Sequence, residues 1–165
     1  IRDRVVLVKR SVLFIFLMLF SLSSIAASLD SEERLFLELI NNYRLQHNIS
    51  EMKVSEALTN AAKWLSEDMA TFRYFQHQPD SQKRTMALRL SQFGYSYEKY
   101  STIIAENIAA GNSEAAKTFE QWKNSPGHNT NMLNPSFKVI GIGRFYVKGS
   151  PYSWYWTTDF GGFVD

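Results

Sequence analysis

The chain contains no cysteine among its 165 residues. This absence excludes disulfide frameworks, thiolate zinc sites and cysteine nucleophiles, so any metal or catalytic chemistry must use oxygen or imidazole groups. Hydrophobic residues make up 45% and charged residues 21% of the sequence, which argues against disorder, collagen-like repeats and coiled coils. A chain of this length and composition is expected to fold around one hydrophobic core.

The sequence has no strong charge of either sign, and its small positive charge is unevenly distributed. The net charge is +2, but four of the basic residues, Arg2, Arg4, Lys9 and Arg10, precede a long apolar run at residues 12–25. Without residues 1–27, 14 basic and 15 acidic side chains remain, giving a charge of −1. A nucleic-acid partner therefore has no electrostatic support.

Residues 1–27 combine a basic start, an apolar run and small residues at its end, which are the three parts of a secretory signal peptide. The alternative is a permanent transmembrane anchor, but the run is shorter than the ~20 residues that a span requires. We therefore expect cleavage near Ala26 or Ala27, a mature domain over residues 28–165, and no stable membrane span after cleavage. Export without cysteine favours a secreted bacterial protein, extracellular or periplasmic.

The first half of the mature chain is predicted to be helical. Asp30 followed by Glu33 is typical of a capping box and predicts a helix over 31–46. Ser55 is expected to cap a second helix with one apolar stripe, formed by Leu58, Ala61, Ala62, Leu65, Met69 and Phe72. Residues 75–83 then form a loop, and a short helix over 85–93 ends at Gly94.

The second half is predicted to mix strands and helices. Residues 103–109 form a short strand, and Asn112 or Ser113 caps a helix that runs to 123 and turns Ala116, Phe119 and Trp122 inward. Residues 125–128 break this helix, and a helical turn follows over 129–133. Two strands, 138–147 and 152–160, are joined by four residues and form an antiparallel hairpin. The pattern predicts an α+β fold, a three-layer α-β-α sandwich with a small antiparallel sheet between helices.

Three side chains are the candidates for chemistry: His77, Glu106 and His128. Glu106 lies in an apolar strand, where a carboxylate costs several kcal/mol unless it is paired or hydrogen-bonded. The two histidines lie on loops and are free to converge on it. Two interpretations stay open: a metal-binding or catalytic cleft, or a carboxylate that only fastens the loops around the sheet. His47 is expected to cap or pack at the end of the first helix, and Gly141 and Gly143 to permit close backbone approach.

Several ordered motifs resemble the CAP superfamily, also called the SCP domain, which groups cysteine-rich secretory proteins, antigen 5 and pathogenesis-related protein 1. The resemblance covers residues 33–161, and within the superfamily the sequence looks like the secreted bacterial branch. It is carried by Asn41-Asn42-Tyr43-Arg44 with His47, Phe75-Gln76-His77, Gly94-Tyr95, Glu106-Asn107-Ile108-Ala109, Trp122 with Ser125-Pro126-Gly127-His128, Ile140-Gly141-Ile142-Gly143, and residues 155–161.

The resemblance implies an α-β-α sandwich with a central cleft of two histidines and two acidic residues. The histidines correspond to His77 and His128 and the first acid to Glu106, while Ser125 stands about where relatives place the second acid. Two imidazoles imply weak binding of zinc or a similar divalent ion, with Glu106 as a nearby acidic partner.

Two classes of function follow from this resemblance. The first is a non-enzymatic binding module for a lipid, a sterol, or a cell-envelope or host component. The alternative is a secreted hydrolase or protease in which His77, Glu106 and His128 are the catalytic candidates. No Gly-x-Ser-x-Gly or His-Glu-x-x-His motif supports the enzyme.

Overall fold

The computed structural model describes residues 28–165, so the predicted signal peptide lies outside the described residues. In chain order the elements are α1 (Ser31–Gln46), β1 (Lys53–Val54), α2 (Glu56–Phe72), α3 (Met86–Gln92), β2 (Ile104–Ala110), α4 (Ala115–Lys123), α5 (Pro126–Met132), β3 (Val139–Tyr146) and β4 (Trp154–Gly161). Among residues 28–165, no helix has the length and apolarity needed to cross a bilayer.

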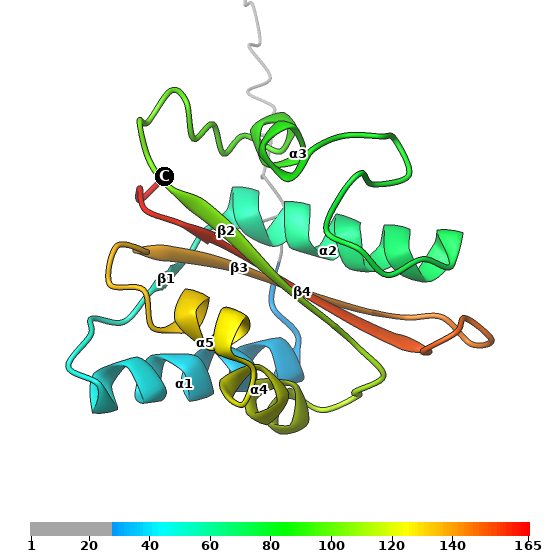
Figure 1. The fold of residues 1–165 in the computed structure, drawn as a ribbon, viewed down its shortest axis with the longest axis horizontal. Helices are drawn as coiled ribbons and strands as arrows, with labels where there is room; N and C mark the ends of the chain where they lie inside the picture. The colour runs from blue at the N-terminus through cyan, green and yellow to red at the C-terminus, as the bar shows by residue number, and fades with distance from the viewer. Residues whose placement is uncertain (1–27) are drawn as a thin grey trace, which may run out of the picture.

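The four strands form one sheet in the order β1-β3-β4-β2. The pairs β3–β4 and β2–β4 are antiparallel, and the short β1 adds a parallel pair with β3. Helices α2 and α3 lie on one side of this sheet, and α1, α4 and α5 lie on the other (Figure 1). The predicted α+β class and three-layer α-β-α sandwich are therefore confirmed, with a mixed sheet as the middle layer.

The starts of the first two long helices follow the predicted capping chemistry. The Asp30 side chain accepts a hydrogen bond from the Glu33 backbone, and the Glu33 side chain accepts one from the Asp30 backbone. Ser55 caps α2 by accepting from the Leu58 amide. Each cap satisfies backbone N–H groups that the helix leaves unpaired, and both helices begin where the sequence predicts.

Helix α2 packs unusually close to β3 because two strand residues facing it are glycines. A Cβ atom added to Gly141 would lie 2.0 Å from the Leu58 carbonyl carbon, and one added to Gly143 would lie 2.3 Å from the Lys63 amide nitrogen. These distances are far inside van der Waals contact. The prediction that the two glycines permit close backbone approach is confirmed, and the approaching backbone is that of a helix.

Four local predictions need correction. Residues 125–128 begin α5 instead of only breaking the preceding helix, because Pro126 occupies the first helical turn, where proline is favoured. Helix α4 is preceded by Glu114, so Ala115 is buried and Ala116 is exposed. Phe72 ends α2 with 63% of its surface exposed. The sequence predicts only a polar connection over residues 48–53, but the two-residue strand β1 begins at the end of that segment.

Candidate functional site

Glu106 lies on β2, which is one of the two edge strands of the sheet. Its side chain is almost fully buried, with 1% exposed, while the ring of His77 is half exposed. The Nδ1 atom of His77 lies 2.8 Å from Oε1 of Glu106. His77 belongs to the loop between α2 and α3, so this hydrogen bond joins that loop to the sheet edge. The structure thus gives the buried carboxylate the histidine partner that the sequence required.

Arg89, on α3, is the second partner of Glu106. Its guanidinium is fully buried and donates to Oε2 of Glu106. Nη1 of the same group lies 3.5 Å from the His77 carbonyl oxygen and 3.7 Å from a carboxylate oxygen of Asp80. Arg89 therefore neutralises Glu106 and anchors the backbone that carries the histidine.

His128 approaches the same strand from the opposite layer, on α5. The Asn107 side chain donates to the His128 carbonyl oxygen at 3.1 Å and accepts from Asn131 at 2.9 Å, which ties α5 to β2. The Nδ1 atom of His128 lies 2.9 Å from the hydroxyl oxygen of Ser125. The Trp122 ring lies beside it, with centroids 5.9 Å apart. The His128 ring is thus held by Ser125 at the start of α5, and among the described residues no hydrogen bond joins this ring to Glu106.

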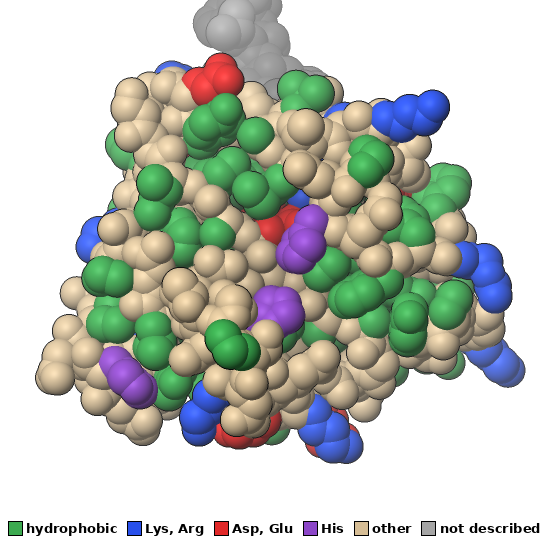
Figure 2. Space-filling view, viewed as in Figure 1, with side chains coloured by type: hydrophobic (Ala, Val, Ile, Leu, Met, Phe, Trp, Pro, Cys, Tyr) green, Lys and Arg blue, Asp and Glu red, His purple; other side chains and the backbone are tan. Residues whose placement is uncertain are grey.

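The two site histidines share one local environment. Figure 2 shows two histidine side chains close together near the centre of one face, with acidic atoms beside one of them, and a third histidine far from both. Burial lowers the pKa of His77, and the Arg89 charge lowers it further. Burial and the His77 ring lower the pKa of His128. Both rings are therefore neutral at neutral pH.

His47 lies apart from this cleft. It caps the end of α1, where Nδ1 lies 2.9 Å from the Tyr43 carbonyl oxygen and the two rings meet edge to face. The predicted capping and packing role of His47 is confirmed.

The donor set limits what metal chemistry the cleft can support. Within residues 28–165, no three His, Asp or Glu side chains are arranged to hold a metal ion together. Both carboxylate oxygens of Glu106 are occupied, one by His77 and one by Arg89. The groups left for ligation are the Nε2 atoms of His77 and His128, for which no protein partner is found in the described part of the chain.

Two residues that surround Glu106 were not predicted as site residues from the sequence: Arg89 and Asp159. Asp159 lies on β4 directly opposite Glu106 and is completely buried. The signal for it was present, because a carboxylate within a buried strand needs a partner for the same reason that Glu106 does. Arg89 gave a weaker signal, namely a cation immediately before Leu90 on a short helix.

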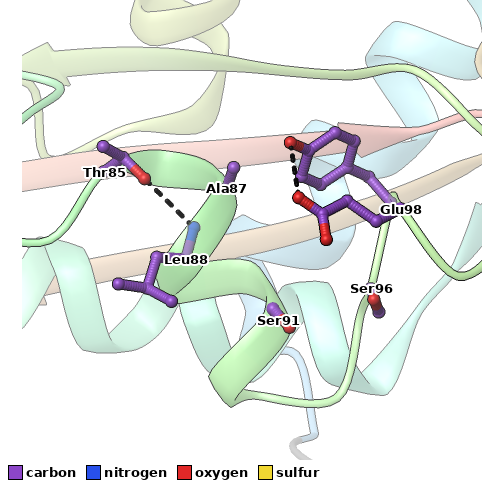
Figure 3. Close-up of a pocket in the computed structure, with 7 residues that line it drawn as sticks. Thr85, Ala87, Leu88, Ser91, Ser96 and Glu98 are labelled. Carbon is purple, nitrogen blue, oxygen red and sulfur yellow. Dashed lines mark hydrogen bonds between the residues drawn. The ribbon is translucent and has the colours of Figure 1, made fainter.

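A separate small cavity lies beside α3. Its volume is about 170 Å³ and its lining includes Thr85, Leu88, Ser91 and Glu98. Figure 3 shows Thr85 capping the start of α3 at the Leu88 amide, with the Glu98 carboxylate bonded to a tyrosine on the facing loop. A volume of this size is below the roughly 300 Å³ at the lower end of small-molecule sites, so the cavity does not offer room for a sterol.

Known proteins are similar to this chain in sequence and in fold. Residues 37–160 match the model of the cysteine-rich secretory protein family, CAP. The chain is 32% identical over 140 residues to the uncharacterized protein YkwD of Bacillus subtilis, covering 85% of this chain and 51% of that protein. The chain thus spans about half the length of the curated relative it matches.

Solved structures agree with the sequence match. An extracellular protein of Bacillus anthracis that contains an SCP domain superposes with a TM-score of 0.65 and 28% identity, covering 77% of this chain and 39% of that one. An outer surface protein of Borrelia burgdorferi superposes with a TM-score of 0.68 and 20% identity, covering 81% and 95% of the two chains.

The helix-sheet-helix sandwich is the fold that these solved structures share with this chain. With three quarters of its length matched by the family model, this chain belongs to the cysteine-rich secretory protein family, although it has no cysteine.

Proposed function

We propose that this chain is an exported, non-enzymatic binding module whose cleft of His77, Glu106 and His128 binds a divalent transition metal such as zinc weakly. The observation that carries the proposal is how the two imidazole rings are hydrogen-bonded. In each ring Nδ1 bonds a protein oxygen, from Glu106 or Ser125, and Nε2 is left without a protein partner among the described residues. Metal-binding histidines are typically held in this way, by a hydrogen bond from the nitrogen that does not ligate.

The affinity is expected to be low. Two protein ligands are fewer than the three or four of lasting zinc sites, and the buried Arg89 cation next to Glu106 repels a second positive charge. Zinc bound at such a site would supply an exchangeable Lewis acid. The protein's own contribution is to hold both rings neutral and oriented.

Calorimetric titration of zinc tests this proposal. Wild type, His128→Ala and Ser125→Glu are compared at about pH 7.5 and about pH 5.5, one unit on either side of the ordinary histidine pKa of ~6.5. Wild type should bind weakly at the higher pH, and His128→Ala should lose binding. Ser125→Glu should tighten binding because a carboxylate on Nδ1 raises the basicity of His128. Equal binding by wild type and His128→Ala would contradict the proposal.

An anionic lipid surface is the envelope partner that the surface chemistry favours. Exposed aromatic side chains lie where α2 ends beside the β3–β4 hairpin: Phe72, Phe75 and Tyr152. Tyr146 is also exposed, but it lies on the opposite face of the hairpin, against Trp154. The rings of Phe75 and Tyr152 lie 5.9 Å apart, and Arg73 bonds the Gly149 carbonyl oxygen at 3.0 Å, so the two segments form one surface.

Charge supports a lipid over a glycan or a host protein at this aromatic surface. Residues 69–79 and 145–154 contain Arg73 and Lys148 and no acidic residue, and the acidic Glu67 lies five residues before Phe72 on α2. Figure 2 shows hydrophobic side chains on the right of this face with Lys or Arg at its edge. Aromatic rings with flanking cations are typical of surfaces that lie at the headgroup level of anionic membranes.

Vesicle co-sedimentation tests the lipid surface. Wild type should sediment with vesicles containing phosphatidylglycerol more than with pure phosphatidylcholine, and a Phe75→Ser, Tyr152→Ser variant should not. Leu45→Ser is the control, because Leu45 is similarly exposed, at 51%, but lies at the end of α1. Equal sedimentation of all three proteins would contradict this part of the proposal, and retention on purified cell wall alone would assign the surface to a glycan.

One contact favours a second candidate function, a hydrolase. The Ser125 hydroxyl oxygen lies 2.9 Å from Nδ1 of His128, within reach for a nucleophile and its base. No carboxylate in the described part of the chain orients the other nitrogen of this ring, and Ser125 also stands at the start of α5. A serine-directed fluorophosphonate probe and a peptidase assay distinguish the two functions. Labelling that is lost in Ser125→Ala would support the enzyme.

A further inference from the structure

Asp159 is a buried carboxyl group that no hydrogen-bond donor reaches. Its residue surface is 0% exposed, and neither carboxyl oxygen has a donor partner within the described residues. It pairs with Glu106 across the antiparallel strands β2 and β4. Residues directly opposite each other point to the same face of a sheet, with Cβ atoms about 5 Å apart. The polar side chain across this ladder from Asp159 is therefore another carboxyl group.

The charges in this buried cluster do not balance if every carboxyl group is ionised. Three carboxyl groups, of Asp80, Glu106 and Asp159, face two guanidinium groups. Asp80 pairs with Arg84 at 2.9 Å, and Glu106 pairs with Arg89. Asp159 is left without a cation. Removing an unpaired carboxylate from water costs several kcal/mol, and a group in this position takes up a proton instead.

We propose that Asp159 is held protonated at neutral pH and donates its proton to Glu106, so that it acts as a positioning residue of the cleft. In this arrangement Glu106 is the ionised acceptor for three donors, from Asp159, Arg89 and His77. The acceptance from His77 places the ring hydrogen on Nδ1 and leaves the Nε2 lone pair free. Asp159 thus sets the tautomer of a histidine that it does not touch, and this holds whether or not the cleft binds metal.

The electrostatics of the strand pair agree with this assignment. Burial and the facing Glu106 raise the pKa of Asp159 well above its ordinary value, and Arg89 and the more distant His77 only partly oppose them. Burial and the Asp80 charge also raise the pKa of Glu106 above its ordinary value, and Arg89 and the hydrogen bond from Asp159 oppose that rise. The two carboxyl groups share one proton, and Asp159, which has no cation of its own, keeps it.

Thermal unfolding of Asp159→Asn without metal tests the inference. Asparagine is neutral like a protonated aspartic acid and donates to Glu106 from the same place. A raised folded pKa means that stability is fully present below the unfolded value of about 3.9 and is lost as pH rises toward the folded pKa. Asp159→Asn removes this loss. Its melting temperature should equal or exceed that of wild type, by a margin that grows between about pH 5 and about pH 8.

Asp68→Asn is the matched control. Asp68 is also a buried aspartate, but its oxygens accept from the Tyr74 hydroxyl at 2.5 Å, from the Ser81 amide at 3.0 Å and from the Ser81 hydroxyl. In Asp68→Asn the NH2 group of the new amide would face hydrogen-bond donors, and one acceptor would be lost. The melting temperature should therefore fall at every pH. If Asp159→Asn falls in the same way, Asp159 is ionised and the inference is overturned.

The carboxyl carbon resonance of Asp159 gives a measurement on the wild-type protein. It should keep the chemical shift of a protonated acid at neutral pH, and sequential resonance assignment of the wild-type protein identifies it. A carboxylate shift at neutral pH would overturn the inference even if the variant did not fold. Zinc titration of the same samples is independent, so a failure of the metal proposal is distinguishable from a failure of this one.

Discussion

Nδ1 of His77 and Oε1 of Glu106 lie 2.8 Å apart although 29 residues separate them in the chain. The histidine comes from the loop that follows α2, and the glutamate comes from the edge strand β2. This hydrogen bond joins the loop of His77 to strand β2. His128 lies near the same strand, on the opposite helical layer. The cleft therefore exists only where the three layers meet.

Replacing Glu106 should destabilise the fold far more than replacing His47. Glu106→Ala removes the nearest anionic partner of the buried Arg89 cation, which keeps only the longer contact with Asp80 at 3.7 Å. Breaking a buried ion pair costs about 3–5 kcal/mol. Glu106→Gln keeps an acceptor for Arg89 and should be milder. His47 is exposed at a helix end, so His47→Ala should change the unfolding free energy by less than about 0.5 kcal/mol. Urea unfolding of the three variants measures this, and equal midpoints for wild type and Glu106→Ala would show that Glu106 is not buried.

The protein should lose stability as pH falls below the ordinary histidine pKa. Burial lowers the folded-state pKa of both His77 and His128, so the unfolded chain takes up protons first. This stability is fully present above the unfolded value of about 6.5 and is lost as pH falls from there through the lower folded values. NMR titration of the ring protons should place both transitions below about 6.5. A transition of either ring above that value would contradict the burial argument.

A methyl group should be tolerated in α5 but not between α2 and β3. Gly141→Ala would place its Cβ against helix backbone, which cannot move aside as a side chain can. The cost of such overpacking is about 1–3 kcal/mol or more. Gly127→Ala is the control, because no atom lies within 4 Å of its added Cβ and alanine favours a helix by up to about 1 kcal/mol over glycine. Thermal unfolding should show a lower midpoint for the first variant alone.

Arg44 should control the order of the chain that follows α5. Its fully buried guanidinium donates to the carbonyl oxygens of Met132, Asn134 and Phe137, at 2.8, 3.0 and 3.0 Å. Arg44→Lys removes the planar fork that reaches several acceptors at once, so hydrogen exchange at residues 133–138 should accelerate. Arg73→Lys, at an exposed arginine with one such bond, should leave these amides unchanged. Unaltered exchange in both variants would show that Arg44 does not hold this segment.

Local chemistry made most of the elements predictable. Asp30 with Glu33, and Ser55 before an apolar stripe, predicted the correct starts of α1 and α2, because a helix start needs side-chain acceptors for its first N–H groups. The errors came where neighbouring elements override local signals. Strand β1 exists because β3 offers it two residues of parallel pairing. Phe72 follows the apolar stripe of α2 but remains exposed at the end of the helix, beyond the part that the sheet buries.

The sequence by itself predicted the family and the layer architecture, because motif order, helix caps and hydrophobic period are local properties of the chain. It offered His77, Glu106 and His128 as candidates for the site. It also showed that Glu106 needs a partner, since the cost of a buried charge depends only on its apolar surroundings. Only the tertiary structure decided which residues are the partners of Glu106. Arg89 and Asp159 reach Glu106 only through packing of α3 and pairing of β4, and these long-range contacts, not the local pattern, set the charge balance of the site.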